Sequence, residues 1–250
     1  MKNGRRLGNS GRLVILSGPS CVGKGPLVKA VTKLYPGLKL DQARPILCHS
    51  RRPRGGEVHG KDYYFLPPAL IKSLRSSNDF VVAPVRSDWQ AIDLLQVEDI
   101  LRDNGLVFAE VFHTFGQPLG ERAAARSGEG GFEAYSVFLL PEEPCTPDDD
   151  IVQTMQVKLA GRGTDEGAKL EERARSAPVE MRSAGDYTHC LLNHAGEDDV
   201  AEWGEFDKAG GRPGSRAING LGDLGQNARW LVETFVQILQ GALGPGDYHP

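Results

Sequence analysis

The segment with the clearest chemical potential is Gly18-Pro-Ser-Cys-Val-Gly23-Lys24, near the start of the chain, which fits the phosphate-loop spacing G-x-x-x-x-G-K. Its glycines let successive backbone N–H groups turn inward on one phosphate group. A helix that begins at the loop would point its positive end at the same anion. Lys24 can reach between the β- and γ-phosphates and follow the charge as it moves, which predicts an ATP site with Lys24 as a catalytic residue. The residues expected to bind ATP there are Gly18, Ser20, Gly23, Lys24 and Gly25.

The position after Lys24 departs from the usual motif. Gly25 stands where Ser or Thr normally supplies a hydroxyl for Mg²⁺, and the next residue, Pro26, has no hydroxyl either. Mg²⁺ is therefore expected to be held through water or by carboxylates elsewhere. Glu110, near the end of a predicted strand, is the best-placed carboxylate. A Glu at a strand end is as often merely solvated, so the metal ligands stay unassigned.

A second informative stretch, Ser50 to Phe65, gathers three arginines in a loop rich in Pro and Gly. Planar guanidinium groups suit bidentate contact with phosphate oxygens, and a tyrosine hydroxyl a short distance along the chain can add a further donor. On these residues alone, a phosphate pocket and a solvated basic turn are equally supported. The residues concerned are Arg51, Arg52, Arg54 and Tyr63.

Strand and helix patterns place the phosphate loop where its chemistry needs it. Leu13 to Leu16 is an apolar run that predicts a buried strand before the loop, and Pro26 to Leu34 has helical spacing with Pro in the first turn. Strand, glycine turn and helix open a βαβ unit. Further core strands are expected at Leu106 to Phe112 and Tyr135 to Leu140, so the predicted fold class is α/β with a parallel sheet flanked by helices.

The remaining segments predict helices, loops and a small lobe outside the main sheet. The lobe is indicated by Arg44 to Leu66, which suggests a loop followed by a short strand. The other expected elements are helices at Pro68 to Leu74, Gln96 to Asn104, Val157 to Met181 and Trp230 to Leu243, a strand at Cys190 to Leu192, an acidic loop at Glu142 to Asp150 and a Gly-rich linker at Gly204 to Asn227.

Together, the phosphate loop and the Ser50 to Phe65 stretch resemble the guanylate kinase family. The stretch is similar to the segment with which that family holds the phosphate of GMP: Arg, one residue, Pro-Arg, one residue, Gly-Glu-Val, then Gly-x-Asp-Tyr. The resemblance implies that Arg51, Arg54 and Tyr63 bind the phosphate of the acceptor substrate. It also implies an ATP-dependent phosphotransferase with Mg²⁺ as cofactor.

The resemblance continues in Gly161-Arg162-Gly-Thr-Asp165, which is followed by Arg173 at the family's interval. In guanylate kinases two such arginines lie on a mobile lid and close over the ATP phosphates, so the resemblance implies that Arg162 and Arg173 are catalytic. Lys158 stands where the family often has another arginine. Tyr187 and Asn193 match a family strand near the adenine, which implies that Asn193 contributes to the ATP site.

The resemblance spans about Leu13 to Asn193 and implies a division of the chain. Residues 1–12 are expected to form a flexible tail, 13–203 a guanylate-kinase-like domain with a P-loop core, and 204–250 a Gly-rich segment with a C-terminal helix. Within the domain, the resemblance implies an acceptor lobe at about 44–97 and a helical lid at about 157–180. The lobe and lid are expected to close when both substrates bind.

The residues that identify guanine in this family are mostly replaced. Ungapped alignment puts Leu47 at a base-reading Ser and Val82 at a base-reading Glu, and Arg86 to Asp93 replaces the family's Gly-Asn-x-Tyr-Gly-Ser/Thr loop. Loss of such hydrogen-bond partners is costly for specificity. Three polar residues of the replaced loop offer another route to a guanine edge, although an exposed polar loop is an equal alternative. They are Asp88, Gln90 and Asp93.

Three functions follow from these observations. The first is a guanylate kinase, which converts ATP and GMP to ADP and GDP. The second is a kinase of the same kind that acts on another nucleoside monophosphate or on ribose 1,5-bisphosphate. The third is a non-catalytic module that binds a protein partner. An intact Lys24 speaks against the third function, and the missing hydroxyl after Lys24 speaks for it.

The composition of the 250 residues is that of a globular protein, with 40% hydrophobic and 25% charged residues. The net charge of −4 argues against a nucleic-acid polymer as main partner and leaves small nucleotides as the expected substrates. The four cysteines, Cys21, Cys48, Cys145 and Cys190, have no zinc-site spacing and are expected to be reduced. The start of the chain resembles neither a signal peptide nor a membrane span, so a cytoplasmic location without membrane contact is expected.

Overall fold

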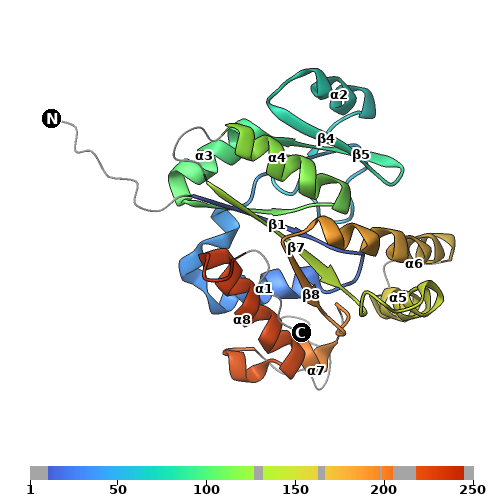
Figure 1. The fold of residues 1–250 in the computed structure, drawn as a ribbon. Coiled ribbons are helices and arrows are strands. Elements are labelled where there is room, and N and C mark those ends of the chain that lie inside the picture. The colour runs from blue at the N-terminus through green and yellow to red at the C-terminus, as the bar shows by residue number, and fades with distance from the viewer. Residues whose placement is uncertain (1–10, 127–131, 163–166, 198, 205–217, 245–250) are drawn as a thin grey trace. The chain divides into compact units, whose positions relative to one another are not determined.

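The computed structural model describes residues 11–126, 132–162, 167–197, 199–204 and 218–244 (Figure 1). The chain divides into two compact units. The first unit comprises the described residues of Met1–Ile15 and Gln42–Tyr135, and the second those of Leu16–Asp41 and Ser136–Pro250. The first unit holds the predicted acceptor segment, whereas the second holds the phosphate loop and the predicted lid segment.

A four-stranded sheet with the order β6-β1-β7-β8 forms the centre of the fold. Strands β7 and β8 pair in parallel, with Val137 opposite His189 and Leu140 opposite Leu192. The apolar run Val137 to Leu140 of β7 is almost fully buried, as expected for a strand covered on both faces. The predicted α/β class with a parallel sheet is thus confirmed. The strand bounds are β1 Arg12–Ser17, β6 Leu106–Glu110, β7 Glu133–Leu140 and β8 His189–Leu192.

A second sheet, with the order β3-β2-β5-β4, lies within the first unit. Strand β5 pairs with β4 in an antiparallel hairpin whose turn contains Arg86 at φ 54°. The alternative of an exposed polar loop does not apply to Asp88 to Asp93, because this segment is a strand that pairs with both β4 and β2. The strand bounds are β2 Cys48–His49, β3 Tyr64–Phe65, β4 Phe80–Val85 and β5 Asp88–Asp93.

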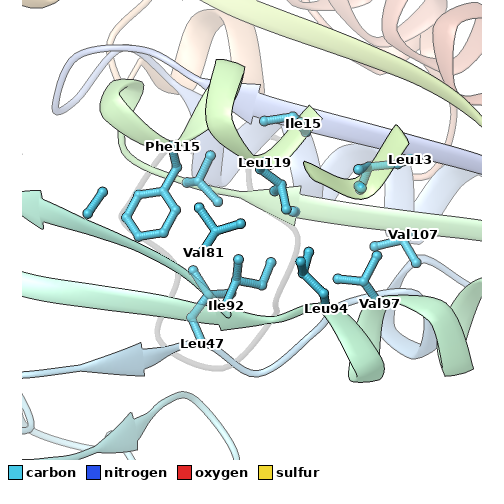
Figure 2. Packing of buried hydrophobic residues seen from close by; sticks show 14 of the residues in the cluster. Leu13, Ile15, Leu47, Val81, Ile92, Leu94, Val97, Val107, Phe115 and Leu119 are labelled. Carbon is cyan, nitrogen blue, oxygen red and sulfur yellow. The ribbon is translucent and has the colours of Figure 1, made fainter. Parts of the chain in front are cut away.

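Three α-helices belong to the first unit. Helix α3 (Leu94–Asn104) begins where the Asp93 carboxylate accepts a hydrogen bond from Leu95 N at 2.9 Å, and ends at Gly105, whose φ is 71°. Helix α2 (Pro68–Ser73) packs beside β4 and β5 (Figure 1), and helix α4 (Gly116–Arg126) follows β6. Figure 2 shows how side chains from β1, β4, β5, β6, α3 and α4 form one apolar cluster, which includes Leu47, Ile92 and Phe115.

The second unit contains five α-helices. They are α1 Lys24–Leu34, α5 Asp148–Arg162, α6 Ala168–Met181, α7 Val200–Trp203 and α8 Gln226–Gln240. Helix α5 begins inside the segment expected to be an acidic loop, because the carboxylates of its first turn are favourable at a helix N-terminus. Helix α8 ends three residues before the expected Leu243, since Gly241 adopts the left-handed conformation at φ 70°.

Short 3₁₀ turns connect several of these elements, at Pro36–Leu38, Leu40–Gln42, Leu74–Ser76, His113–Phe115, Arg182–Asp186 and Leu221–Asp223. Most of residues 204–227, the expected linker, lie outside the described residues. Across the described ranges, no helix combines the length and the apolar character that crossing a membrane requires.

Candidate active site

The phosphate loop lies between the end of β1 and the start of α1, and its backbone conformation needs glycine at two positions. Gly18 and Gly23 have φ angles of 141° and 91°. A Cβ on Gly18 would lie 2.6 Å from the carbonyl oxygen of Leu139, and a Cβ on Gly23 would overlap the side-chain amide of Asn193. The two glycines of the motif therefore allow close packing as well as the turn itself.

Lys24 is held inside the loop that it belongs to. Its Nζ donates to the carbonyl oxygens of Gly18 and Pro19, each at 2.7 Å. Helix α1 starts here, and its N-cap residue, Gly23, provides no side-chain hydrogen bond to the first turn. The first N–H groups of a helix have no partner within the helix, so the end of α1 fits an anion such as a phosphate.

Asn193, expected in the ATP site, is fully buried after the end of β8 and contacts the backbone of the phosphate loop. Its Nδ2 donates to the carbonyl oxygen of Val22 at 2.7 Å, and its Oδ1 accepts from the backbone N–H of Ala195 at 3.2 Å. Its own backbone N–H donates to the carbonyl oxygen of Leu140 at 2.8 Å. Asn193 thus fixes the position of the phosphate loop relative to β7 and β8.

Lys158 connects helix α5 to Asn193 and to the end of β7. Its Nζ donates to the carbonyl oxygens of Asn193 at 3.1 Å and Pro141 at 3.4 Å. Burial lowers the pKa of Lys158 to about 8, against the opposing effect of the Glu142 and Asp199 carboxylates. The ammonium group therefore holds the carboxyl ends of both β7 and β8.

A cavity of about 700 Å³ opens beside Lys158, between α5 and the segment that follows β8. Most of the lining residues have polar side chains, although the surface that they present to the cavity is more apolar than polar. The lining residues are Asp150, Gln153, Thr154, Val157, Lys158, Gly161, His194, Gly196 and Asp199. Tyr187, which precedes β8, packs in the core, where its ring meets that of Phe138 at a centroid distance of 5.0 Å. Burial raises the pKa of Tyr187 to about 12.

The two predicted lid arginines lie on neighbouring helices. Arg162 is the last residue of α5, and its side chain and residues 163–166 lie outside the described part of the chain. Arg173 lies in α6, where its carbonyl oxygen accepts from Ser176 Oγ at 2.9 Å. Helices α5 and α6 thus lie on either side of residues 163–166, within the segment that was predicted to be helical.

The predicted acceptor grip is assembled within the first unit. The Arg51 guanidinium donates to both carboxylate oxygens of Glu57, at 2.5 and 2.6 Å, and the backbone N–H of Arg54 donates to the same carboxylate at 2.7 Å. The hydrogen bond from Arg51 is the main reason that the pKa of Glu57 falls to about 2. Arg51 also lies over the rings of Tyr63 and Phe65, at 5.1 and 5.5 Å. Arg51 and Tyr63 are therefore brought together, as the sequence predicts.

His49 is a second support of this grip, and sequence reasoning missed it. Its Nδ1 accepts from the backbone N–H of Arg51 at 3.2 Å, and its ring meets the edge of Tyr63 at 5.3 Å. Burial lowers the pKa of His49 to about 4, with Arg51 acting in the same direction. The imidazole is therefore neutral at physiological pH, and Nε2 carries its proton. The only sequence signal was a His directly before the Ser-Arg-Arg run.

Glu110, the candidate metal ligand, is paired with a cation in the first unit. Its carboxylate lies 3.4 Å from Nη2 of Arg44. Burial raises the pKa of Tyr63, and the charge of Glu110 adds to that rise, so Glu110 acts on the acceptor grip. Among the described residues, no group of three or more His, Cys, Asp or Glu side chains is placed to hold a metal ion.

The two positions that replace guanine-reading residues lie on opposite faces of the second sheet. Leu47 belongs to the large apolar cluster with Ile92 (Figure 2). Val82 packs on the other face, in a small cluster with Cys48, Ile71 and Ala91. Both positions are thus apolar, and only Leu47 shares a face with Ile92 and with the neighbouring polar residue of β5, Gln90.

Comparison with known proteins gives the family. The guanylate kinase family model matches residues 10–108. A guanylate kinase from Mycobacterium bovis is 28% identical over 208 residues, which cover 77% of this chain and 84% of that protein. The crystal structure of guanylate kinase from Anaplasma phagocytophilum aligns with a TM-score of 0.47 and 20% identity, over 75% of this chain and 79% of that one. A guanylate kinase from Mycolicibacterium paratuberculosis is 30% identical over 198 residues, 77% of this chain and 78% of that protein, and on this likeness the chain belongs to the guanylate kinase family.

Proposed function

We propose that the chain is an ATP-dependent guanylate kinase, which transfers the γ-phosphoryl group of ATP to GMP and forms ADP and GDP. One observation supports the proposal: two separate segments have the donors that a phosphate needs, the loop at Gly18 to Lys24 and the pair Arg51 and Tyr63, whose arginine is held by Glu57. Two such sites suit a reaction in which both the donor and the acceptor are phosphorylated. The curated relatives described above carry the same name.

ATP is the donor that the second unit fits. The loop N–H groups and the N-terminus of α1 would bind the β-phosphate, and Lys24 would exchange its carbonyl partners for phosphate oxygens. The cavity beside Lys158 would take the adenine base. Since Mg²⁺ usually binds through substrate phosphates, water and one or two carboxylates, it would arrive as MgATP, held chiefly by the nucleotide itself.

The acceptor phosphate would bind Arg51, Arg54 and Tyr63. Glu57 holds the Arg51 side chain before the substrate arrives, which reduces the side-chain entropy lost on binding, and His49 holds the Arg51 backbone. We also propose that residues 44–97 act as the acceptor lobe and 157–180 as the lid. In that arrangement Arg162 and Arg173 would neutralise the charge on the transferred group.

A second candidate, a kinase for a different phosphorylated acceptor, is favoured by Leu47. This residue stands where guanylate kinases have a base-reading Ser, and it is buried in an apolar cluster. The phosphate grip would serve such an acceptor equally well. A panel of acceptors therefore separates the two candidates.

The test is a coupled assay of ADP release with purified protein, MgATP and GMP, dGMP, AMP, CMP, UMP or ribose 1,5-bisphosphate. Lys24→Ala should abolish turnover, whereas Lys29→Ala, an exposed lysine on the same helix, should leave it unchanged. Turnover on GMP above the other acceptors supports the proposal. Preferred turnover on another acceptor supports the second candidate. Turnover on none of them, with ATP still bound, would favour a protein-binding module.

A further inference from the structure

Three polar residues of the replaced base-reading segment are candidates for contact with a guanine edge, and the fold itself uses two of them. Asp88 accepts a hydrogen bond from Ser50 Oγ at 2.9 Å, and Asp93 caps helix α3 through Leu95 N at 2.9 Å. Both carboxylates thus have structural partners within the first unit. The third polar residue, Gln90, has a different environment.

Gln90 lies at the centre of the acceptor sheet and buries a hydrogen-bond acceptor without a partner. Its strand, β5, runs between β2 and β4, and the residue is 6% exposed. Its Oε1 has no hydrogen-bond partner among the described residues. An unsatisfied buried acceptor destabilises the folded chain. A buried acceptor without a partner requires an explanation, and a bound substrate would provide the missing hydrogen-bond donor.

The neighbours of Gln90 place it beside the acceptor grip. His49 is its direct partner across the β2–β5 ladder, so both side chains lie on one face of the sheet. The His49 ring touches Tyr63, and its Nδ1 is taken by the backbone N–H of Arg51. The remaining nitrogen, Nε2, carries a proton to donate. One hydrogen-bond donor and one unused acceptor therefore stand next to the residues that would hold the acceptor phosphate.

We propose that Gln90, together with His49, reads the base of the acceptor nucleotide in place of the missing Ser and Glu. Oε1 of Gln90 accepts from the N1–H and 2-amino groups of guanine, and Nε2–H of His49 donates to its O6. This inference rests on the proposed function and names the specificity residues of its acceptor site.

Guanine fits this pair better than the other purine. Its edge presents two adjacent N–H donors that converge on one oxygen, beside a carbonyl oxygen that accepts. Adenine presents one amino group beside an unprotonated ring nitrogen, so it satisfies Oε1 only once. A site with a buried polar group discriminates strongly against a substrate that leaves that group unpaired.

The decisive variant is Gln90→Leu, with Gln96→Leu as the matched control. Leucine removes the orphan acceptor at nearly constant volume, so Gln90→Leu should unfold at a higher temperature than the wild type. The KM for GMP should rise about 10- to 100-fold, while the KM for ATP stays within twofold. Gln96 already has a partner, because its Oε1 accepts from the backbone N–H of Ile46 at 2.5 Å. Gln96→Leu should therefore lower the unfolding temperature and leave the preference for GMP unchanged.

A second measurement compares GMP with inosine monophosphate, which lacks the 2-amino group. The wild type should prefer GMP, and Gln90→Leu should bring the two kcat/KM values within about twofold of each other. An unchanged KM for GMP in Gln90→Leu, or a fall in its unfolding temperature, would overturn the inference while leaving the proposed function intact. No transfer to GMP by the wild type would refute the proposed function, and the guanine assignment with it.

Discussion

The support of the phosphate loop by Asn193 can be tested with the substitution Asn193→Ala. The change removes the donor to the Val22 carbonyl oxygen and the acceptor for the Ala195 N–H. Val22 and Ala195 are both buried, so water does not readily replace the lost hydrogen bonds of these two backbone groups. The loop would lose its attachment to β8 although none of its own residues changes.

The size of the effect follows from those two orphaned groups. Each unsatisfied buried group costs about 1–3 kcal/mol, so the free energy of unfolding should fall by about 2–6 kcal/mol. That is a large part of the 5–15 kcal/mol by which most domains are stable, roughly speaking. Because the loop would also sample other conformations, the KM for ATP should rise at least about tenfold, and the KM for GMP should not follow.

Urea unfolding and steady-state kinetics measure these two quantities. The matched control is Asn104→Ala, which removes a bond of the same kind, from Asn104 Nδ2 to the Gln42 carbonyl oxygen at 3.1 Å, at an exposed position. The control should cost no more than about 0.5 kcal/mol. If Asn193→Ala were as stable as Asn104→Ala, or if its KM for ATP were that of the wild type, the Asn193 side chain would not support the phosphate loop.

Three further predictions concern charge and backbone conformation. The pKa of Lys158 is about 8 in the folded chain and ordinarily 10.5, so the unfolded chain binds more protons between these pH values. The free energy of unfolding of the wild type should therefore rise relative to that of Lys158→Met between pH 8 and 10.5, by at most about 3 kcal/mol. Urea titrations at each pH measure this difference. Glu57→Gln should raise the KM for the acceptor about tenfold, because it frees the Arg51 side chain. The wild type should be more stable than Glu57→Gln, and this difference should shrink as pH falls from about 4.5 to 2. An unchanged KM would contradict the proposed role of Glu57. Gly23→Ala should abolish ATP binding in calorimetry because its Cβ meets Asn193, whereas Gly37→Ala, which has open space around its Cβ, should bind ATP normally.

The phosphate loop and its flanking elements were predictable because they depend on neighbouring residues. Leu13 to Leu16 is continuously apolar, and Gly18 to Lys24 carries its own turn chemistry, so strand, loop and helix follow from local pattern. The approach of Arg51 to Tyr63 was predictable only through the family resemblance. Nothing in their spacing requires the two side chains to stack.

The remaining features depend on contacts between distant segments. The run Asp88 to Asp93 becomes a strand because β2 and β4 flank it, and this pairing cannot be read from a segment that also resembles a polar loop. The proposed roles of His49 and Gln90 likewise depend on the pairing of two strands that are about 40 residues apart in the sequence. Whether Gln90 has a partner is a property of the folded environment, so composition and spacing carry no signal for it.

The bond between Asn193 and Val22 also orders events in time, because it joins residues 171 positions apart. A nascent chain exposes the complete phosphate-loop sequence early in synthesis, yet the partner that fixes the loop is made much later. Contacts of such long sequence separation form slowly, after the intervening chain has been ordered. A fragment that stops before β8 would therefore contain the whole motif and still lack the contact that fixes the loop, so we expect the loop to reach its final conformation only when β8 docks.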